Sequence, residues 1–417
     1  MSPKLAEAKT TSQRPLDGDR RRTGASTRSF QDRRLTVETI SDFGSFLSLA
    51  PVWDHLVERA GIDHPFLRHD WVRIWWDCFG TGKELRIFVV KAGEEAVAIA
   101  PFMLSRGRMC GCPVRLMEFI SNVYTERFDL VLTRSSQEAC RAIWRHLMTQ
   151  KGLWDVVRLC QLPAGSRALE ELPRLATADG FLTGIWRSLD SPFIDLTGGW
   201  EAYLKGLSSN QRHNVRRWLY RLGQLGEVKL EVISSGEQLD AALNDGFRIE
   251  ASDWKSRSGT AILCQSELKR FLTQLAGATS RSGLLRLIFL TVGQSRIAFA
   301  YALCYRNKLF VLKAGYDPQY ATYSPYNLLC YLVFRDACER GLAEYEFLGA
   351  SESWKLHWTK QTRSHYWLYV FSTSLRIRLL YYAKFRVVPS LERLRCYRFL
   401  RDPVVRLSGL SGFRRMP

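Results

Sequence analysis

The 417-residue sequence lacks the features that identify several large protein classes. No apolar run approaches the roughly 18–20 residues that a membrane-spanning helix needs. There is no C-x-x-C pair and no match to G-x-x-x-x-G-K-[ST], H-E-x-x-H or G-x-S-x-G, which argues against P-loop, zincin and nucleophile-elbow chemistry. The first 30 residues are polar and basic without an apolar core, so we expect no secretory signal.

Acidic residues are scarce relative to basic ones. The chain has 60 Lys and Arg against 41 Asp and Glu, a net charge of +19, which favours an anionic partner such as a phosphorylated ligand, nucleic acid or a lipid surface. The excess lies at the ends: residues 1–34 hold nine basic and four acidic residues, and residues 376–417 hold eleven and two. Because the middle is nearly balanced, nucleic acid is the least favoured of the three partners.

The ten cysteines show no disulfide or metal pattern. Several lie inside apolar runs, which predicts buried free thiols in a reducing cytoplasm. Cys110 and Cys112 are close in sequence, but no nearby histidine completes a ligand set, so we predict no metal site.

The second half of the chain alternates strand and helix signals. Three β-rich runs, 284–292, 296–305 and 308–314, predict an antiparallel meander. Helical periodicity follows over 325–340, with Ser324 as the expected N-cap, Pro325 at the first position and Gly341 at the C-terminal stop. A strand is predicted over 344–348, which gives the order β-β-β-α-β.

The first half shows the same order. Strands are predicted over 85–90, 96–104, 114–120, 128–132 and 154–160, with a helix over 137–151. This pattern indicates either a tandem duplication or a chance recurrence of a common unit. The predicted organisation is a disordered basic leader (1–34), two domains (35–195 and 196–372) and a basic amphipathic segment (373–417). That segment either lies on anionic lipid or packs on the main body, and Pro389 shortens any membrane face.

Three segments of the second half carry a family resemblance. The run from Lys313 to Pro325, the strand at 344–348 and the run from Glu352 to Trp358 resemble the acetyltransferase domain of the BioF2-like group in the GNAT superfamily. This group includes CelD-type proteins linked to cellulose and exopolysaccharide biosynthesis and is related to the FemAB-type peptidyltransferases. The segments 66–71 and 98–102 resemble the same long proteins more loosely, so that the resemblance covers roughly residues 35–372.

The resemblance implies an α/β (α+β) fold with tandem GNAT-like domains, each a mixed, mostly antiparallel sheet flanked by helices. It also implies an acyl-CoA co-substrate and no permanently bound cofactor. The chain departs from the GNAT pattern in two places. The signature Gln/Arg-x-x-Gly-x-Gly/Ala is absent between Ala314 and Leu329, and Ser351 stands where an acidic residue is common.

The start of the predicted helix at Ser324 is the candidate donor site. Free amide groups and the positive end of a helix dipole can hold a pyrophosphate, although a capped helix without a ligand is the alternative. The GNAT pattern implies a backbone oxyanion donor on the preceding strand. The predicted donor-binding residues are Leu312, Lys313, Tyr323, Ser324, Tyr326 and Asn327.

Amine acylation needs a base and an acid for the leaving thiolate. The predicted catalytic residues are Asp317, Tyr316 and Glu352, with Tyr323 as a second candidate acid. Asp317 is equally suited to a turn, the tyrosines to amphipathic packing, and Glu352 to an ion pair with Lys355.

The predicted substrate-binding residues each have a structural alternative. Trp254 and Lys255 would present an aromatic face beside a cation, as a sugar or nucleotide requires, and Trp254 is equally suited to the core. Lys355 would clamp an anion. Arg212 and Arg216 lie four apart in a basic helix and would either bind a phosphate-linked acceptor or form a solvated face.

These features lead to one main hypothesis and two alternatives. The main one is a cytoplasmic N-acyltransferase, at the inner membrane face if the basic end binds lipid, that acts on an amine-bearing sugar or lipid-linked acceptor. The alternatives are Fem-like transfer from aminoacyl-tRNA, and a non-catalytic scaffold for envelope-polysaccharide synthesis. We expect the second half to be the active one.

Overall fold

The computed structural model describes residues 35–133, 136–252 and 259–387, all of them in the unit that begins at Leu35. The predicted leader 1–34 and the C-terminal residues from 388 onward lie outside the described residues.

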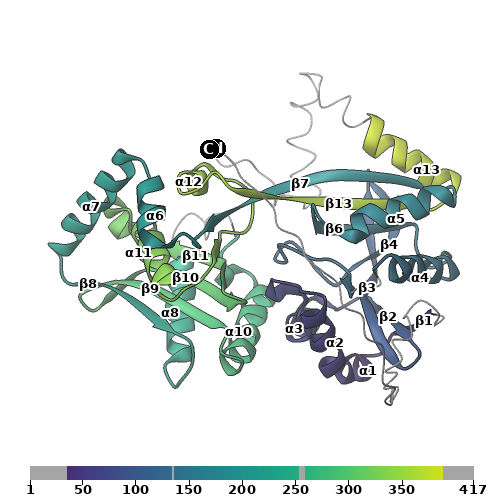
Figure 1. Ribbon diagram of the computed structural model, residues 1–417, viewed down its shortest axis with the longest axis horizontal. Helices are drawn as coiled ribbons and strands as arrows, with labels where there is room; N and C mark the ends of the chain where they lie inside the picture. The colour runs from purple at the N-terminus through teal and green to yellow at the C-terminus, as the bar shows by residue number, and fades with distance from the viewer. Residues whose placement is uncertain (1–34, 134–135, 253–258, 388–417) are drawn as a thin grey trace, which may run out of the picture. The chain divides into compact units, whose positions relative to one another are not determined.

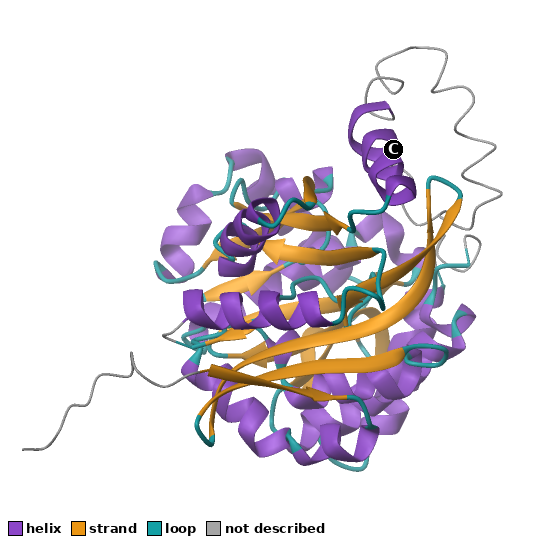
Figure 2. Cartoon of the chain, turned by 90° about the vertical axis from the view of Figure 1, so that its right-hand side faces the viewer, coloured by secondary structure: helices purple, strands orange, loops and turns teal. Residues whose placement is uncertain are grey.

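The strands of the described chain form one mixed sheet of thirteen strands (Figures 1 and 2). They are β1 (Leu35–Ile40), β2 (Glu84–Ala92), β3 (Glu95–Met109), β4 (Cys112–Phe119), β5 (Val131–Leu132), β6 (Val156–Pro163), β7 (Leu182–Asp195), β8 (Val228–Ile233), β9 (Leu285–Val292), β10 (Ser295–Tyr305), β11 (Lys308–Tyr316), β12 (Glu344–Glu346) and β13 (Thr362–Phe371).

Helices cover both faces of this sheet (Figure 2). The α-helices are α1 (Phe43–Ser48), α2 (Ala50–Arg59), α3 (His69–Phe79), α4 (Ser136–Thr149), α5 (Arg167–Ala178), α6 (Gly199–Gly206), α7 (Ser209–Gly223), α8 (Leu239–Ala251), α10 (Ser266–Arg281), α11 (Pro325–Glu339), α12 (Ser353–Leu356) and α13 (Leu375–Tyr382). Short 3-10 helices are η2 (Pro65–Leu67), η3 (Ile262–Cys264) and η4 (Pro318–Tyr323), and a π-helical turn, η5 (Ala383–Val387), follows α13.

The strand order shows two copies of one unit with their last strands exchanged. The sheet runs β1-β2-β3-β4-β6-β13-β7-β12-β11-β10-β9-β8. Within each half the pairing is antiparallel except for β4 with β6 and β11 with β12, which are parallel. β13, from the second half, lies between β6 and β7 (Figure 1). β7, from the first half, pairs with β12 of the second half.

One of the three clusters of buried apolar side chains contains residues from both halves. In α3 the buried residues Trp71, Ile74, Trp75 and Cys78 follow helical spacing. The ring of Trp71 packs edge-on against Phe271 of α10, with centroids 5.2 Å apart. Helices α3 and α10 hold equivalent places before β2 and β9, so the two repeats contact each other through matching elements.

The helices and strands predicted from the sequence are present, but their first and last residues differ from the predicted ones. The meander, the helix at 325 and the parallel strand after it are confirmed, and helix α11 stops before Gly341, which has φ +71°. Three strand predictions are wrong in extent. The strand expected over 96–104 continues to Met109. The strand expected over 128–132 covers only Val131–Leu132, and the strand expected over 344–348 ends at Glu346, because Leu348 adopts a left-handed backbone conformation that no strand accommodates. The division into domains at residue 195 stays a prediction.

Candidate active site

A β-bulge lies in β11 at the predicted oxyanion donor. Tyr301 of β10 pairs with Lys313 and the next residue, Ala302, pairs with Val311, so Leu312 has no opposite residue on β10. A bulged residue is left outside the hydrogen-bond ladder and bends its strand. The equivalent strands of the first half, β3 and β4, pair without a register shift. The bulge therefore distinguishes the second half from the first at this pair of strands.

Helix α11 begins with an unusual N-cap. Ser324 has φ 50° and ψ 53°, and its side chain makes no capping hydrogen bond. The expectation of a side-chain cap was wrong, because capping requires an extended backbone at this residue. Within the described residues, no hydrogen bond reaches the amides of Tyr326 or Asn327, whereas the Leu328 amide donates to the Ser324 carbonyl. Two amide donors at the positive end of α11 thus remain available to an anion.

A guanidinium group lies beside this helix start. Arg221, in the last turn of α7, lies 5.2 Å from the centroid of the Tyr323 ring and donates to the Thr322 carbonyl at 3.5 Å. Arg212 instead donates to the carbonyls of Leu204 and Leu207 at the end of α6. The structure therefore brings Arg221 to the predicted donor site, and places Arg212 at a helix terminus.

Arg216, the other arginine predicted to bind substrate, is exposed on α7. Sequence reasoning identified the basic stripe of this helix but not which of its arginines reaches the donor site. The contact with residues 322 and 323 depends on how α7 packs, and spacing alone gives no signal for it.

The loop after β12 is held in a strained conformation. Leu348 and Gly349 are consecutive left-handed residues, with φ 57° and 63°. The Lys355 ammonium, whose residue is only 7% exposed, donates to the carbonyls of Leu348 and Ala350 at 2.8 and 3.1 Å and pairs with Glu352 at 3.0 Å. The ion pair that the structural alternative expected is therefore present, although its lysine is buried and not at the surface. Strained backbone maintained by buried polar groups is typical of functional sites.

A carboxylate from the first half contacts this loop. Glu126, in the connection between β4 and β5, accepts a hydrogen bond from the Gly349 amide at 3.1 Å. Burial raises the pKa of Glu126, although the Lys355 charge and the Gly349 hydrogen bond act to lower it. A carboxylate whose pKa is raised is a stronger base than an ordinary glutamate, as a general base requires. Sequence reasoning missed Glu126, because the contact joins residues 223 apart in the chain.

Lys313, next to the bulged residue Leu312, contacts Tyr124 of the β4–β5 connection, which also carries Glu126. The Lys313 ammonium lies 5.0 Å from the centroid of the Tyr124 ring, and the Tyr124 hydroxyl hydrogen-bonds to Gln265. The first half thus places an aromatic ring beside Lys313 of β11, and the Lys313 charge also acts to lower the pKa of Glu126.

Trp354 joins the donor end of the site to this polar cluster. Its ring lies 5.2 Å from that of Tyr326, and its indole N–H donates to the Glu352 carboxylate at 2.9 Å. Burial raises the pKa of Tyr326 well above its usual value, so its phenol stays protonated. The contacts therefore run without a break from the first turn of α11 to Glu352 and Lys355.

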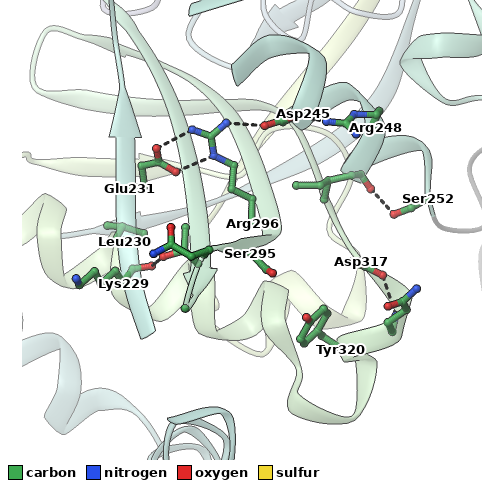
Figure 3. Close-up of a pocket in the computed structure, with 15 residues that line it drawn as sticks. Lys229, Leu230, Glu231, Asp245, Arg248, Ser252, Ser295, Arg296, Asp317 and Tyr320 are labelled. Atoms are coloured by element: carbon green, nitrogen blue, oxygen red, sulfur yellow. Dashed lines mark hydrogen bonds and ion pairs between the residues drawn. The ribbon is translucent and has the colours of Figure 1, made fainter. Parts of the chain in front are cut away.

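Asp317 faces a different part of the surface. It lines a groove of about 1020 Å³ between α8, the β8–β10 strands and η4 (Figure 3). Its carboxylate accepts the Gln319 amide at 2.9 Å and caps η4, as the turn alternative expected. The neighbouring Tyr316 carbonyl accepts from the Ser252 hydroxyl at 3.2 Å. Neither contact tests a catalytic role for these two residues.

The arginine Arg296 in this groove is paired with carboxylates of the groove itself. Arg296 contacts both Glu231 oxygens at 2.7 and 2.8 Å and Asp245 at 2.7 Å (Figure 3). A guanidinium with two carboxylates around it is not set up to take an anionic ligand.

Two substrate-site predictions cannot be placed. Trp254 and Lys255 lie outside the described residues. Glu250, just before them, is buried, and its carboxylate accepts the Ile262 amide at 2.9 Å. Within the described ranges, no cluster of three or more His, Cys, Asp or Glu side chains is arranged to hold a metal ion. The same ranges contain no helix with the length and apolar character needed to span a bilayer.

Residues 209–356 match the family model of the acetyltransferase (GNAT) domain. The match contains the bulge, the start of α11 and the Lys355 cluster, and it supports the predicted GNAT-type acyltransferase. No curated protein matches the chain in a sequence comparison.

Two solved structures share the fold over most of the chain. FemX aligns at a TM-score of 0.54 with 13% identity, covering 78% of this chain and 98% of FemX. The C-terminal (DUF2156) domain of an Agrobacterium fabrum protein assigned as a lysylphosphatidylglycerol synthetase aligns at 0.50 with 13% identity, covering 81% and 96%. At this identity the likeness establishes the fold alone.

Proposed function

We propose that the chain is an N-acyltransferase that moves an acyl group from an acyl-CoA thioester to an amine. The observation that carries the proposal is the start of α11. The Tyr326 and Asn327 amides have no hydrogen-bond partner among the described residues, and Arg221 contacts Thr322 and Tyr323 just before them. A diphosphate bound there gains hydrogen bonds from the amides and charge from the guanidinium. The match of residues 209–356 to an acetyltransferase family supports the same donor class.

The chemistry follows from the groups around β11. Glu126 accepts a proton from the ammonium of the acceptor, and the free amine attacks the thioester carbonyl. The bulged backbone at Leu312 donates to the oxyanion, as the resemblance implies. The C–N bond forms and the C–S bond breaks, and Tyr316 protonates the leaving thiolate. Glu352 keeps Lys355 and Trp354 in place and is thus a positioning residue here.

The acceptor and the location rest on the family resemblance. We infer an amine-bearing sugar or lipid-linked precursor of an exopolysaccharide, cellulose or another envelope polymer. We also infer a cytoplasmic location with peripheral attachment to the inner membrane face.

Calorimetry with acetyl-CoA and longer acyl-CoAs tests donor binding. Arg221→Ala should weaken binding by about tenfold or more, since it removes a charge-assisted contact of about 1.5–3 kcal/mol. Arg335→Ala, which removes an arginine paired with Glu339 on the surface of α11, is the matched control and should bind as the wild type does. A folded wild-type sample that gives no heat at high micromolar donor would refute the proposal.

A second candidate is transfer from an aminoacyl-tRNA. The six-residue 3-10 helix η4 occupies the position of the missing Gly-rich signature, and the fold is shared with FemX. RNase-sensitive activity, or tRNA that co-purifies with the chain, would favour this candidate over acyl-CoA.

A further inference from the structure

Helix α13 has two apolar stripes, and only one of them is covered. Ile377 and Leu380 are buried against the sheet. On the other side, Leu375, Leu379 and Tyr382 are 76%, 61% and 46% exposed. These three follow the i, i+4, i+7 spacing of a single helix face. An apolar face of this kind is costly to leave in water, which is why such a face usually marks a contact surface.

Trp186 of β7 lies on the same side of the sheet as this stripe. A side chain at Gly184 would meet the ring of Phe385, so η5 packs directly over β7 at that point. Residues two apart on a strand share a face, which places Trp186 on the side that η5 covers. Trp186 is 40% exposed, and the Lys384 ammonium lies 5.7 Å from its ring. The strand thus adds an aromatic residue beside the helix.

The segment that carries the stripe has charged residues of one sign only. Residues 373–387 contain Arg376, Arg378, Lys384 and Arg386 and no acidic residue. Arg376 is fixed to the main body, through Asp155 at 3.4 Å and the Pro113 carbonyl at 2.9 Å. Exposed apolar side chains, an indole and basic groups are the combination that binds the interface of an anionic bilayer.

We propose that this lipid stripe, made of Leu375, Leu379, Tyr382 and Trp186, docks on an anionic lipid surface. The proposal rests on the peripheral location inferred above and gives that location a defined surface. The partner's negative charge complements the basic residues of 373–387, and its apolar interior receives the leucines. Lipid binding here does not depend on the donor site, so the two can succeed or fail separately.

Vesicle co-sedimentation of the full chain tests this surface. Vesicles of phosphatidylcholine with 30% phosphatidylglycerol should bind the wild type at least tenfold more tightly than vesicles of phosphatidylcholine alone. Each basic residue near an anionic surface raises the binding affinity about fivefold. Leu375→Glu/Leu379→Glu should weaken binding at least tenfold. Leu225→Glu, which changes a leucine 53% exposed elsewhere, should bind like the wild type. Raising the salt from 50 to 500 mM should release most of the protein.

Three results would overturn the proposal. One is equal binding of wild type and Leu375→Glu/Leu379→Glu. Another is loss of binding only in Arg398→Glu/Arg401→Glu, which would assign the lipid contact to the chain beyond residue 387. The third is a wild-type dimer that Leu379→Glu dissociates, which would make a second copy the occupant. Acetyl-CoA calorimetry on the same samples shows separately whether the transferase assignment fails. If the double variant does not fold, Arg378→Glu is a second variant for the vesicle assay.

Discussion

Replacing Glu126 by glutamine separates the two roles that its carboxylate can play. Glutamine keeps an oxygen that can accept the Gly349 amide, so the loop at 348–349 should stay in place. It cannot accept a proton from an ammonium. If Glu126 is the general base, Glu126→Gln should lower kcat/KM by about 10²- to 10⁴-fold, the usual contribution of such a group. If it only supports the loop, the rate should change little.

The stability of this variant should not fall with its activity. Burial raises the pKa of Glu126, which means that its charged form is disfavoured in the folded protein. Glutamine removes that penalty but also removes the attraction to Lys355. Because these two effects oppose each other, we expect the free energy of unfolding to stay within about 1 kcal/mol of the wild type.

The assay is a steady-state pH profile with acetyl-CoA and a small amine, beside urea unfolding of the same samples. The wild-type kcat/KM should fall on the acid side with a pKa above the ordinary 4.5 of glutamate, and this limb should vanish in the variant. Glu339→Gln, at a surface ion pair on α11, serves as the control. A Glu126→Gln enzyme with more than a third of wild-type kcat/KM and an unchanged acid limb would disprove the assignment.

Two further predictions concern stability, and both use urea unfolding. Arg127→Ala should lower the free energy of unfolding by about 3 kcal/mol. The fully buried Glu346 carboxylate has two guanidinium partners, Arg127 at 3.2 Å and Arg363 at 2.6 Å, and the variant leaves only the second. A loss below about 1 kcal/mol would contradict this. Burial raises the pKa of Asp129 from 3.8 to about 7, so the native state binds the carboxyl proton more tightly than the unfolded state does. The free energy of unfolding should therefore fall by up to about 4 kcal/mol as the pH rises from 4 to 7. Asp129→Asn should flatten that part of the pH dependence, and an unaltered profile would show that Asp129 does not cause it.

Local signals were enough to predict much of the second half. The meander and α11 follow from period-two and period-3.6 patterns with turn residues between them, and those patterns act over a few residues. The turn role of Asp317 was also readable, because Asp-Pro favours a turn in any context. The pairing of Glu352 with Lys355 follows from their spacing alone.

Long-range contacts could not be predicted in this way. The exchange of β7 and β13 joins strands that are far apart in the sequence, and nothing in either strand specifies its partner. Glu126 and Arg221 reach the site through packing between distant elements. The left-handed Ser324 was missed for a different reason, since serine before proline normally indicates an extended N-cap and the tertiary structure overrides that preference here.

The position of β13 between β6 and β7 also affects synthesis on the ribosome. The first-half strands β1 to β6 have no hydrogen-bonded contact with β7 except through β13, which spans Thr362–Phe371. The sheet can therefore close only when most of the chain has emerged, and until then β6 and β7 expose unpaired edges. Such edges invite aggregation, so we expect nascent chains truncated before Thr362 to need chaperones, whereas chains released after Phe371 should fold unaided.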